Sequence, residues 1–87
     1  MIIVDVRTPE EYADGHVPGA INVPVQVLME EIENKVSDKS AEIKLYCRSG
    51  ARADVALQMM KSMGYTDVTN EGGVTWWDGE LNTGMQP

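Results

Sequence analysis

The chain has 87 residues and a formal net charge of −7, from 14 acidic and 7 basic side chains. A chain this short fills one hydrophobic core, so we expect a single domain over residues 1–87. Because clustered Lys and Arg are needed to neutralise phosphates, the acidic balance argues against binding to nucleic acid or to an anionic membrane surface. The one cysteine excludes an intramolecular disulfide and a cysteine-rich metal site.

The sequence also bears on membranes, cofactors and location. No run of roughly 18 apolar residues is present, so no membrane-spanning helix is expected. No metal or cofactor is expected either. The chain opens on a strand pattern without a signal peptide, which is compatible with the cytoplasm and with export after removal of a signal. The oligomeric state is not readable from the sequence.

The first predicted elements are a strand and a short helix. The β-branched run over residues 2–6 is typical of a strand buried on both faces of a parallel sheet. Thr8 is predicted to cap a helix that begins at Pro9, with Glu11 completing a capping box and Gly15 ending the helix. The further expectations, in chain order, are a turn over 16–19, a strand over 20–23, a helix over 25–36, a strand over 43–47, a helix over 51–63, a strand over 65–69, a turn over 70–73 and a short tryptophan-containing helix from Val74.

Strand and helix patterns therefore alternate along the whole chain. This alternation predicts an α/β domain in three layers, with a small, mostly parallel sheet of about four strands flanked by helices. Sheets of this kind bind ligands beyond the carboxyl ends of their strands. Cys47 is the last residue of the predicted third strand and so belongs to that edge.

Cys47 is the main candidate for chemistry. A lone cysteine in an apolar strand is most often a small buried hydrophobe. Here a polar loop and then a helix follow at once, so the thiol faces free backbone N–H groups and the positive end of the helix dipole. These surroundings favour the thiolate, which is the reactive form of cysteine. Ser49 is predicted to cap the helix, and Gly50 to let the backbone curl close to a ligand.

Two arginines, Arg48 and Arg52, flank this cysteine in sequence. Each guanidinium matches oxyanions such as sulfonate and phosphate. Arg52 lies in the first turn of the predicted helix, where the dipole disfavours a cation, and this favours a ligand-binding role. The predicted substrate-binding segment is the loop that follows Cys47, namely Arg48, Ser49, Gly50, Ala51 and Arg52.

Other polar and sulfur-containing residues are interpreted as structural. No sequence pattern brings the imidazole of His16 to Cys47, so His16 is expected to hydrogen-bond to backbone. Asp5 is expected to order the region of Arg7 and His16 through hydrogen bonds. The methionines of the predicted helix over 51–63 are expected to pack in the core.

Three motifs in order along the chain resemble those of rhodanese domains. Residues 5–12 and 15–24, Asp-Val-Arg-Thr-Pro-Glu-Glu-Tyr and Gly-His-Val-Pro-Gly-Ala-Ile-Asn-Val-Pro, resemble the N-terminal signature of that family. Residues 47–52, Cys-Arg-Ser-Gly-Ala-Arg, resemble its active-site loop, and Gly72-Gly73-Val74 with Trp77 resembles its C-terminal element. The chain starts at the Asp-Val-Arg strand and so resembles the small single-domain bacterial thiosulfate sulfurtransferases of the phage-shock type. The continuation over 78–81 departs from the usual family pattern.

The resemblance implies an enzyme that moves a sulfane sulfur from thiosulfate to cyanide or a thiol. Carried onto this chain, it makes Cys47 the nucleophile and the site of a persulfide. The loop amides from Arg48 to Arg52 would then surround the terminal sulfur, and the two arginines would orient the anionic donor. Since the chain has no second cysteine, the acceptor must come from outside.

Two alternatives stay open. Cysteine phosphatases and arsenate reductases of the same fold use a loop with arginine six positions after the cysteine, whereas here Ala53 is sixth and Arg52 fifth. Some rhodanese-like domains have lost the cysteine and act as non-catalytic binding modules. Cys47 and both arginines are present in this chain.

Overall fold

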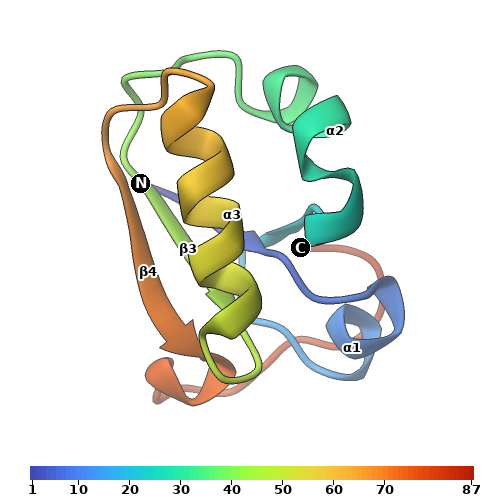
Figure 1. Cartoon of the computed structure of the whole chain (residues 1–87). Coiled ribbons are helices and arrows are strands. Elements are labelled where there is room, and N and C mark those ends of the chain that lie inside the picture. The colour runs from blue at the N-terminus through green and yellow to red at the C-terminus, as the bar shows by residue number, and fades with distance from the viewer.

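The computed structural model describes all 87 residues as a four-stranded parallel sheet with helices on its faces (Figure 1). The strand order is β2-β1-β3-β4. No helix has the length and apolar content needed to cross a membrane. The elements are β1 (Ile2–Asp5), α1 (Pro9–Asp14), β2 (Ile21–Asn22), the 3-10 turn η1 (Val25–Val27), α2 (Leu28–Lys35), β3 (Ile43–Cys47), α3 (Ala51–Ser62), β4 (Val68–Gly73) and the 3-10 turn η2 (Val74–Trp76).

Successive side chains of β3 point to opposite faces of the sheet, and each face packs against its own layer. Ile43, Leu45 and Cys47 face a core of 14 buried residues that includes side chains of α2 and α3. Tyr46 faces the opposite side, where a smaller core brings together β1, α1 and the chain after β4. Figure 1 shows α2 and α3 together on one side of the sheet and α1 near the carboxyl ends of the strands. The predicted α/β fold with a parallel sheet is confirmed.

The short helix α1 begins as predicted. The Thr8 side chain accepts a hydrogen bond from the backbone N–H of Glu11, and the Glu11 carboxylate accepts one from the backbone N–H of Thr8. Pro9 occupies the first helical position, and Gly15 follows the last turn. Two orphan N–H groups of the helix start are thereby satisfied, which fixes where this six-residue helix begins.

A buried ion pair connects β1 to the surrounding loops. Arg7 donates from Nη2 to Asp5 Oδ2 at 2.6 Å and to the carbonyl oxygen of Gly15 at 2.6 Å. The hydroxyl of Tyr46 donates to Asp5 Oδ2 at 2.8 Å and accepts from the backbone N–H of Val17 at 3.0 Å. Since Asp5 is fully buried, these partners are what make its burial tolerable. The expectation that Asp5 orders this region is met for Arg7.

Three expectations about element bounds are wrong. The helix over 25–36 is divided into η1 and α2, since Val27 has a non-helical ψ of 9° and no capping side chain. The strand over 20–23 is only two residues long. The predicted turn over 70–73 is the end of β4, which runs from Val68 to Gly73 and not over 65–69. A bulge between β3 and β4 accommodates Gly72 at φ 93° within that strand.

The last residues fold back onto α1 and the loop after it. Backbone groups of His16 and Asn82 bond to each other in both directions at 2.9 Å, and the N–H of Gly84 donates to Ala13 at 2.8 Å. The backbone N–H of Gly19 donates to the carbonyl oxygen of Pro87 at 3.0 Å. Residues 82–87 thus form an irregular segment that is bonded to the end of α1 and to the loop over 16–19.

Candidate active site

Cys47 lies where β3 ends and the loop to α3 begins, at the carboxyl edge of the sheet. Its Sγ accepts hydrogen bonds from the backbone N–H of Gly50 at 2.9 Å and of Ala53 at 3.4 Å. Only 1% of the residue is exposed. The thiol therefore lies just beneath a loop whose residues Arg48 and Ser49 are exposed, and is surrounded by donors instead of apolar atoms alone.

These donors shift the acidity of the thiol. Burial alone raises the pKa of Cys47, because it removes water from the thiolate. The backbone N–H groups of Ala53, Ser49, Gly50 and Arg52 act in the opposite direction and outweigh burial, so the pKa of Cys47 lies below its ordinary value. Amide donors at a helix start thus stabilise a thiolate, as the sequence predicts.

Gly50 shapes the loop, and Ser49 does not cap the helix. Gly50 is the residue before the first turn of α3, with φ 100°, and no side chain caps this helix end. The expectation that Ser49 caps it is wrong. The left-handed conformation of Gly50 turns its own N–H toward Cys47 Sγ, and a side chain there would be strained. In place of a capping side chain, the sulfur of Cys47 accepts hydrogen bonds from the backbone N–H groups at this helix start.

Strand β4 supports the loop that follows Cys47. Asn70 donates from Nδ2 to the carbonyl oxygen of Gly50 at 3.0 Å, and its Oδ1 accepts from the N–H of Gly72 at 2.8 Å. Gly73 pairs with Cys47, and the carbonyl of Arg48 passes so close to it that no side chain fits at that position. The sequence predicts a plain turn for residues 70–73. An asparagine shortly before two glycines is typical of a turn, so the sequence does not indicate that Asn70, Gly72 and Gly73 support the loop after Cys47.

The two arginines differ in their partners. Arg48 is exposed and takes part in no ion pair of the structure. Arg52 donates from Nη1 to Glu11 Oε1 at 2.7 Å and from Nη2 to Glu11 Oε2 at 3.0 Å. The hydrogen bond from Arg52 lowers the pKa of Glu11 to about 2. This contact between α1 and α3 was missed in the sequence, where Glu11 was assigned only to the capping box.

The histidine is structural, as predicted. The ring of His16 stacks on Tyr12 with 3.7 Å between centroids. Its Nδ1 lies 2.8 Å from the carbonyl oxygen of Tyr12, and its Nε2 lies 3.0 Å from that of Gln86. Both ring nitrogens are thus engaged with backbone away from Cys47. The methionines of α3 and its C-cap also pack as expected, with Met60 fully buried and Met59 and Met63 against the same core.

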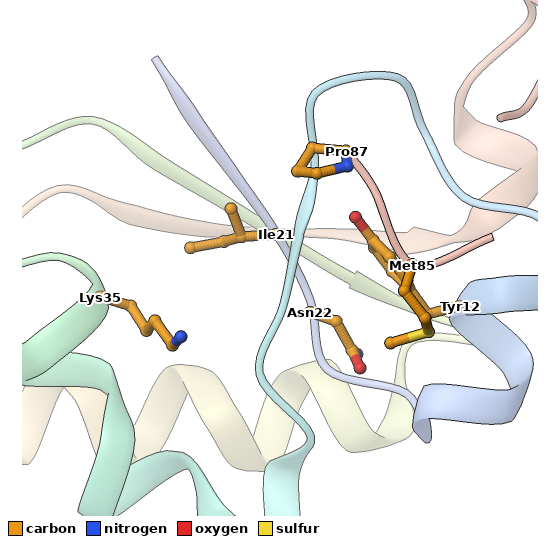
Figure 2. Close-up of a pocket in the computed structure, with 6 residues that line it drawn as sticks. All are labelled: Tyr12, Ile21, Asn22, Lys35, Met85 and Pro87. Atoms are coloured by element: carbon orange, nitrogen blue, oxygen red, sulfur yellow. The ribbon is translucent and has the colours of Figure 1, made fainter. Parts of the chain in front are cut away.

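A pocket of about 240 Å³ lies at the β2 edge, apart from the cysteine loop (Figure 2). The hydroxyl of Tyr12 is bonded to the carbonyl of Ala20, and the amide of Asn22 donates to the carbonyls of Asp5 and Arg7. The pocket is lined by no cysteine or histidine. Its lining residues are Tyr12, Ile21, Asn22, Lys35, Met85 and Pro87.

The geometry at Cys47 defines an α/β domain with a buried cysteine that accepts backbone hydrogen bonds at the start of a helix. Among solved structures, the chain is similar to a rhodanese with anions from E. coli, with a TM-score of 0.90 and 38% identity over 95% of this chain and 98% of that one. It is also similar to a human single-domain sulfurtransferase, with a TM-score of 0.73 and 32% identity over 84% of this chain and 75% of that one. The fold is that of the rhodaneses.

Sequence relatives agree with the structural ones. The chain is 44% identical to the thiosulfate sulfurtransferase PspE of Escherichia coli over 71 residues, which cover 82% of this chain and 68% of that protein. It is 37% identical to a sulfurtransferase of Allochromatium vinosum over 78 residues, which cover 88% of this chain and 71% of that protein. Residues 1–80 match the rhodanese-like domain family. The chain belongs to this family, and its relatives place it among the sulfurtransferases.

Proposed function

We propose that this protein is a thiosulfate sulfurtransferase that carries sulfur as a persulfide on Cys47. The observation that carries the proposal is the set of backbone N–H donors on Sγ, of which those of Gly50 and Ala53 lie at 2.9 and 3.4 Å. A thiolate with a depressed pKa is both a nucleophile and a good leaving group, and sulfur transfer requires both properties in turn. The activity named for the PspE relative supports the same donor.

The reaction consists of two displacements at sulfur. The Cys47 thiolate attacks the outer sulfur of thiosulfate, the S–S bond of the donor breaks, and sulfite leaves with the electron pair. The resulting persulfide anion has its terminal sulfur among the loop amides from Arg48 to Arg52. Cyanide or an external thiolate then attacks that terminal sulfur, forming thiocyanate or a new persulfide. The Cys47 thiolate is released, and neither a metal nor a redox cofactor takes part.

The loop also favours sulfur over phosphate as the group transferred. In phosphoryl transfer the loop must surround three equatorial oxygens of the transition state, whereas a persulfide presents a single terminal atom. Arg52 is the fifth residue after Cys47, and both of its Nη atoms are bonded to Glu11. The short loop and this engaged arginine support sulfur transfer over phosphate hydrolysis.

A donor panel read by intact mass tests the proposal. Thiosulfate should add one sulfur atom to the protein, and cyanide should remove it. Mercaptopyruvate is the comparison donor and an aryl phosphate the phosphatase control. The variant Cys47→Ser should gain no mass and keep the wild-type circular dichroism spectrum. A wild-type mass that stays unchanged with thiosulfate would refute the proposed function.

A further inference from the structure

The side chain of Glu11 lies between α1 and the cysteine loop. Its two carboxylate oxygens lie 2.7 and 3.0 Å from the two terminal nitrogens of Arg52, which is a bidentate pair between helices that are far apart in sequence. About a third of each side chain is exposed, at 32% for Arg52 and 29% for Glu11. A dissolved anion can therefore reach the pair.

Glu11 is fixed on its own helix before it meets Arg52. Its Oε1 accepts from the backbone N–H and from the hydroxyl of Thr8, each at 3.2 Å. This capping box holds the carboxylate in place, so it is not a mobile surface group. Arg52 in turn is a cation in the first turn of α3, where the helix dipole opposes it, and Glu11 offsets that cost.

The position of Arg52 connects this pair to the thiol. Its backbone N–H belongs to the donors that lower the pKa of Cys47. The pKa of Arg52 is raised mainly by its hydrogen bond to Glu11 and, to a smaller extent, by the charge of Cys47. A guanidinium takes one bidentate carboxylate or sulfonate at its two Nη atoms at a time. An oxyanion that binds at the fork of Arg52 thus meets a guanidinium whose two Nη atoms are already bonded to Glu11.

We propose that Glu11 is a specificity-determining residue that competes with the anionic sulfur donor for Arg52. This inference rests on the proposed function for the identity of the donor. Glu11 makes the paired arginine a weak receptor for dianions and leaves the exposed Arg48 as the unpaired cation of the loop. Affinity for the donor is thereby limited by a carboxylate of the protein itself.

Sulfate binding tests this competition without any sulfur transfer. Sulfate resembles the sulfonate end of thiosulfate, and its dissociation constant is measured from amide NMR shifts of Gly50 and Ala53. In Glu11→Gln the capping acceptor stays and the charge goes, so sulfate should bind about threefold to fivefold tighter than in the wild type. Glu10→Gln is the matched control, because Glu10 is exposed on the same helix and lacks contact with Arg52. It should change sulfate affinity far less.

A double-variant cycle assigns the effect to the pair. Arg52→Gln should bind sulfate more weakly than the wild type, and the double variant Glu11→Gln with Arg52→Gln should bind it no more tightly than Arg52→Gln alone, because Glu11 then has no arginine to compete for. If Glu11→Gln fails to fold, Glu11→Asp replaces it, since the shorter carboxylate withdraws from the fork and should also tighten sulfate binding. Equal sulfate affinity in Glu11→Gln and Glu10→Gln would overturn the inference, as would a gain that survives loss of Arg52.

Steady-state kinetics separate competition from a merely structural role. With thiosulfate as donor, Glu11→Gln should lower KM by a factor similar to that for sulfate and leave kcat nearly unchanged. A fall in kcat without a change in KM would instead indicate a structural role and contradict the inference. If the wild type forms no persulfide with thiosulfate, the proposed function fails, while the sulfate titrations still decide the role of Glu11.

Discussion

The carbonyl oxygen of Arg48 occupies the space that a side chain on Gly73 would need. Gly73 has φ −97° and ψ 172°, which any residue adopts, so glycine is required here for space and not for backbone conformation. The loop after Cys47 therefore packs directly on the backbone of β4. This close approach fixes the position of the loop N–H groups relative to the sulfur of Cys47.

Gly73→Ala should push the loop away from β4. We expect a loss of about 1–3 kcal/mol in the free energy of unfolding, typical of overpacking, and slower alkylation of Cys47. Urea unfolding and iodoacetamide kinetics measure the two effects. Gly19→Ala is the control, because its Cβ would meet nothing within 4 Å although φ is 86°. That variant should lose some stability and keep the wild-type reactivity of Cys47.

Removal of the Asn70 side chain should loosen the same loop. Asn70→Ala deletes the donor to Gly50 and the acceptor for Gly72, so we expect a loss of about 1–3 kcal/mol and a higher pKa of Cys47. The neighbouring Thr69→Ala, at an exposed position of β4, is the control and should leave the thiol unchanged. An unaltered Cys47 pKa in Asn70→Ala would mean that the loop keeps its shape without this support.

Alkylation of Cys47 should follow the depressed pKa of the thiol. Because only the thiolate reacts, a pKa below the ordinary value moves the midpoint of the rate profile to lower pH. We expect the iodoacetamide rate of the folded protein to reach its half-maximal value at a lower pH than the rate of a free cysteine does. N-acetylcysteine is the reference, and the urea-unfolded protein should match it. Identical midpoints for folded and unfolded protein would contradict the role of the amide donors.

Acid should weaken the contact between α1 and α3. The pKa of Glu11 is about 2 in the folded protein and 4.5 without its partners, so its contribution to stability is present above pH 4.5 and is lost as pH falls toward 2. Glu11→Gln removes this proton uptake and should show a shallower decline in stability over that range than Glu10→Gln. Urea midpoints at steps of pH measure it. Parallel declines in the stability of the two variants would exclude Glu11 as a source of the acid-induced loss of stability.

Loss of the buried arginine should be the most destabilising change of this set. Arg7→Leu leaves the fully buried Asp5 without its cation, and such broken pairs cost about 3–5 kcal/mol. Glu33→Gln breaks the exposed pair with Lys39 and should cost less than about 1 kcal/mol. Urea unfolding at neutral pH compares the two. Similar losses would indicate that Asp5 is neutralised in another way.

Local patterns in the sequence predict the parts of this structure that local interactions decide. The capping box at Thr8, the helix from Ala51 and the place of Cys47 at a strand end follow from residues within a few positions of each other. The extent of β4 does not, because Asn70 to Gly73 continue as a strand only by pairing with β3. Pairing across the sheet overrides the turn propensity of asparagine and glycine.

The same distinction applies to the site. The chemistry of Cys47 could be inferred from its neighbours in sequence, since the donors come from the six residues that follow it. The partner of Arg52 could not, because Glu11 is 41 positions away and already had a local role in the capping box. The Glu11 carboxylate makes a local contact with Thr8 and a tertiary contact with Arg52, and only the local contact can be recognised in the sequence.

The burial of Cys47 separates reactivity from cross-linking. An intermolecular disulfide needs two sulfur atoms about 2.05 Å apart and their Cβ atoms about 3.8 Å apart. With 1% of Cys47 exposed under a loop fixed to β4, two folded copies cannot bring their sulfur atoms together. The proposed sulfur transfer requires only that a small donor or acceptor reach this sulfur. The loop after Cys47 therefore protects the thiol from covalent dimerisation, a protection that does not depend on a second cysteine.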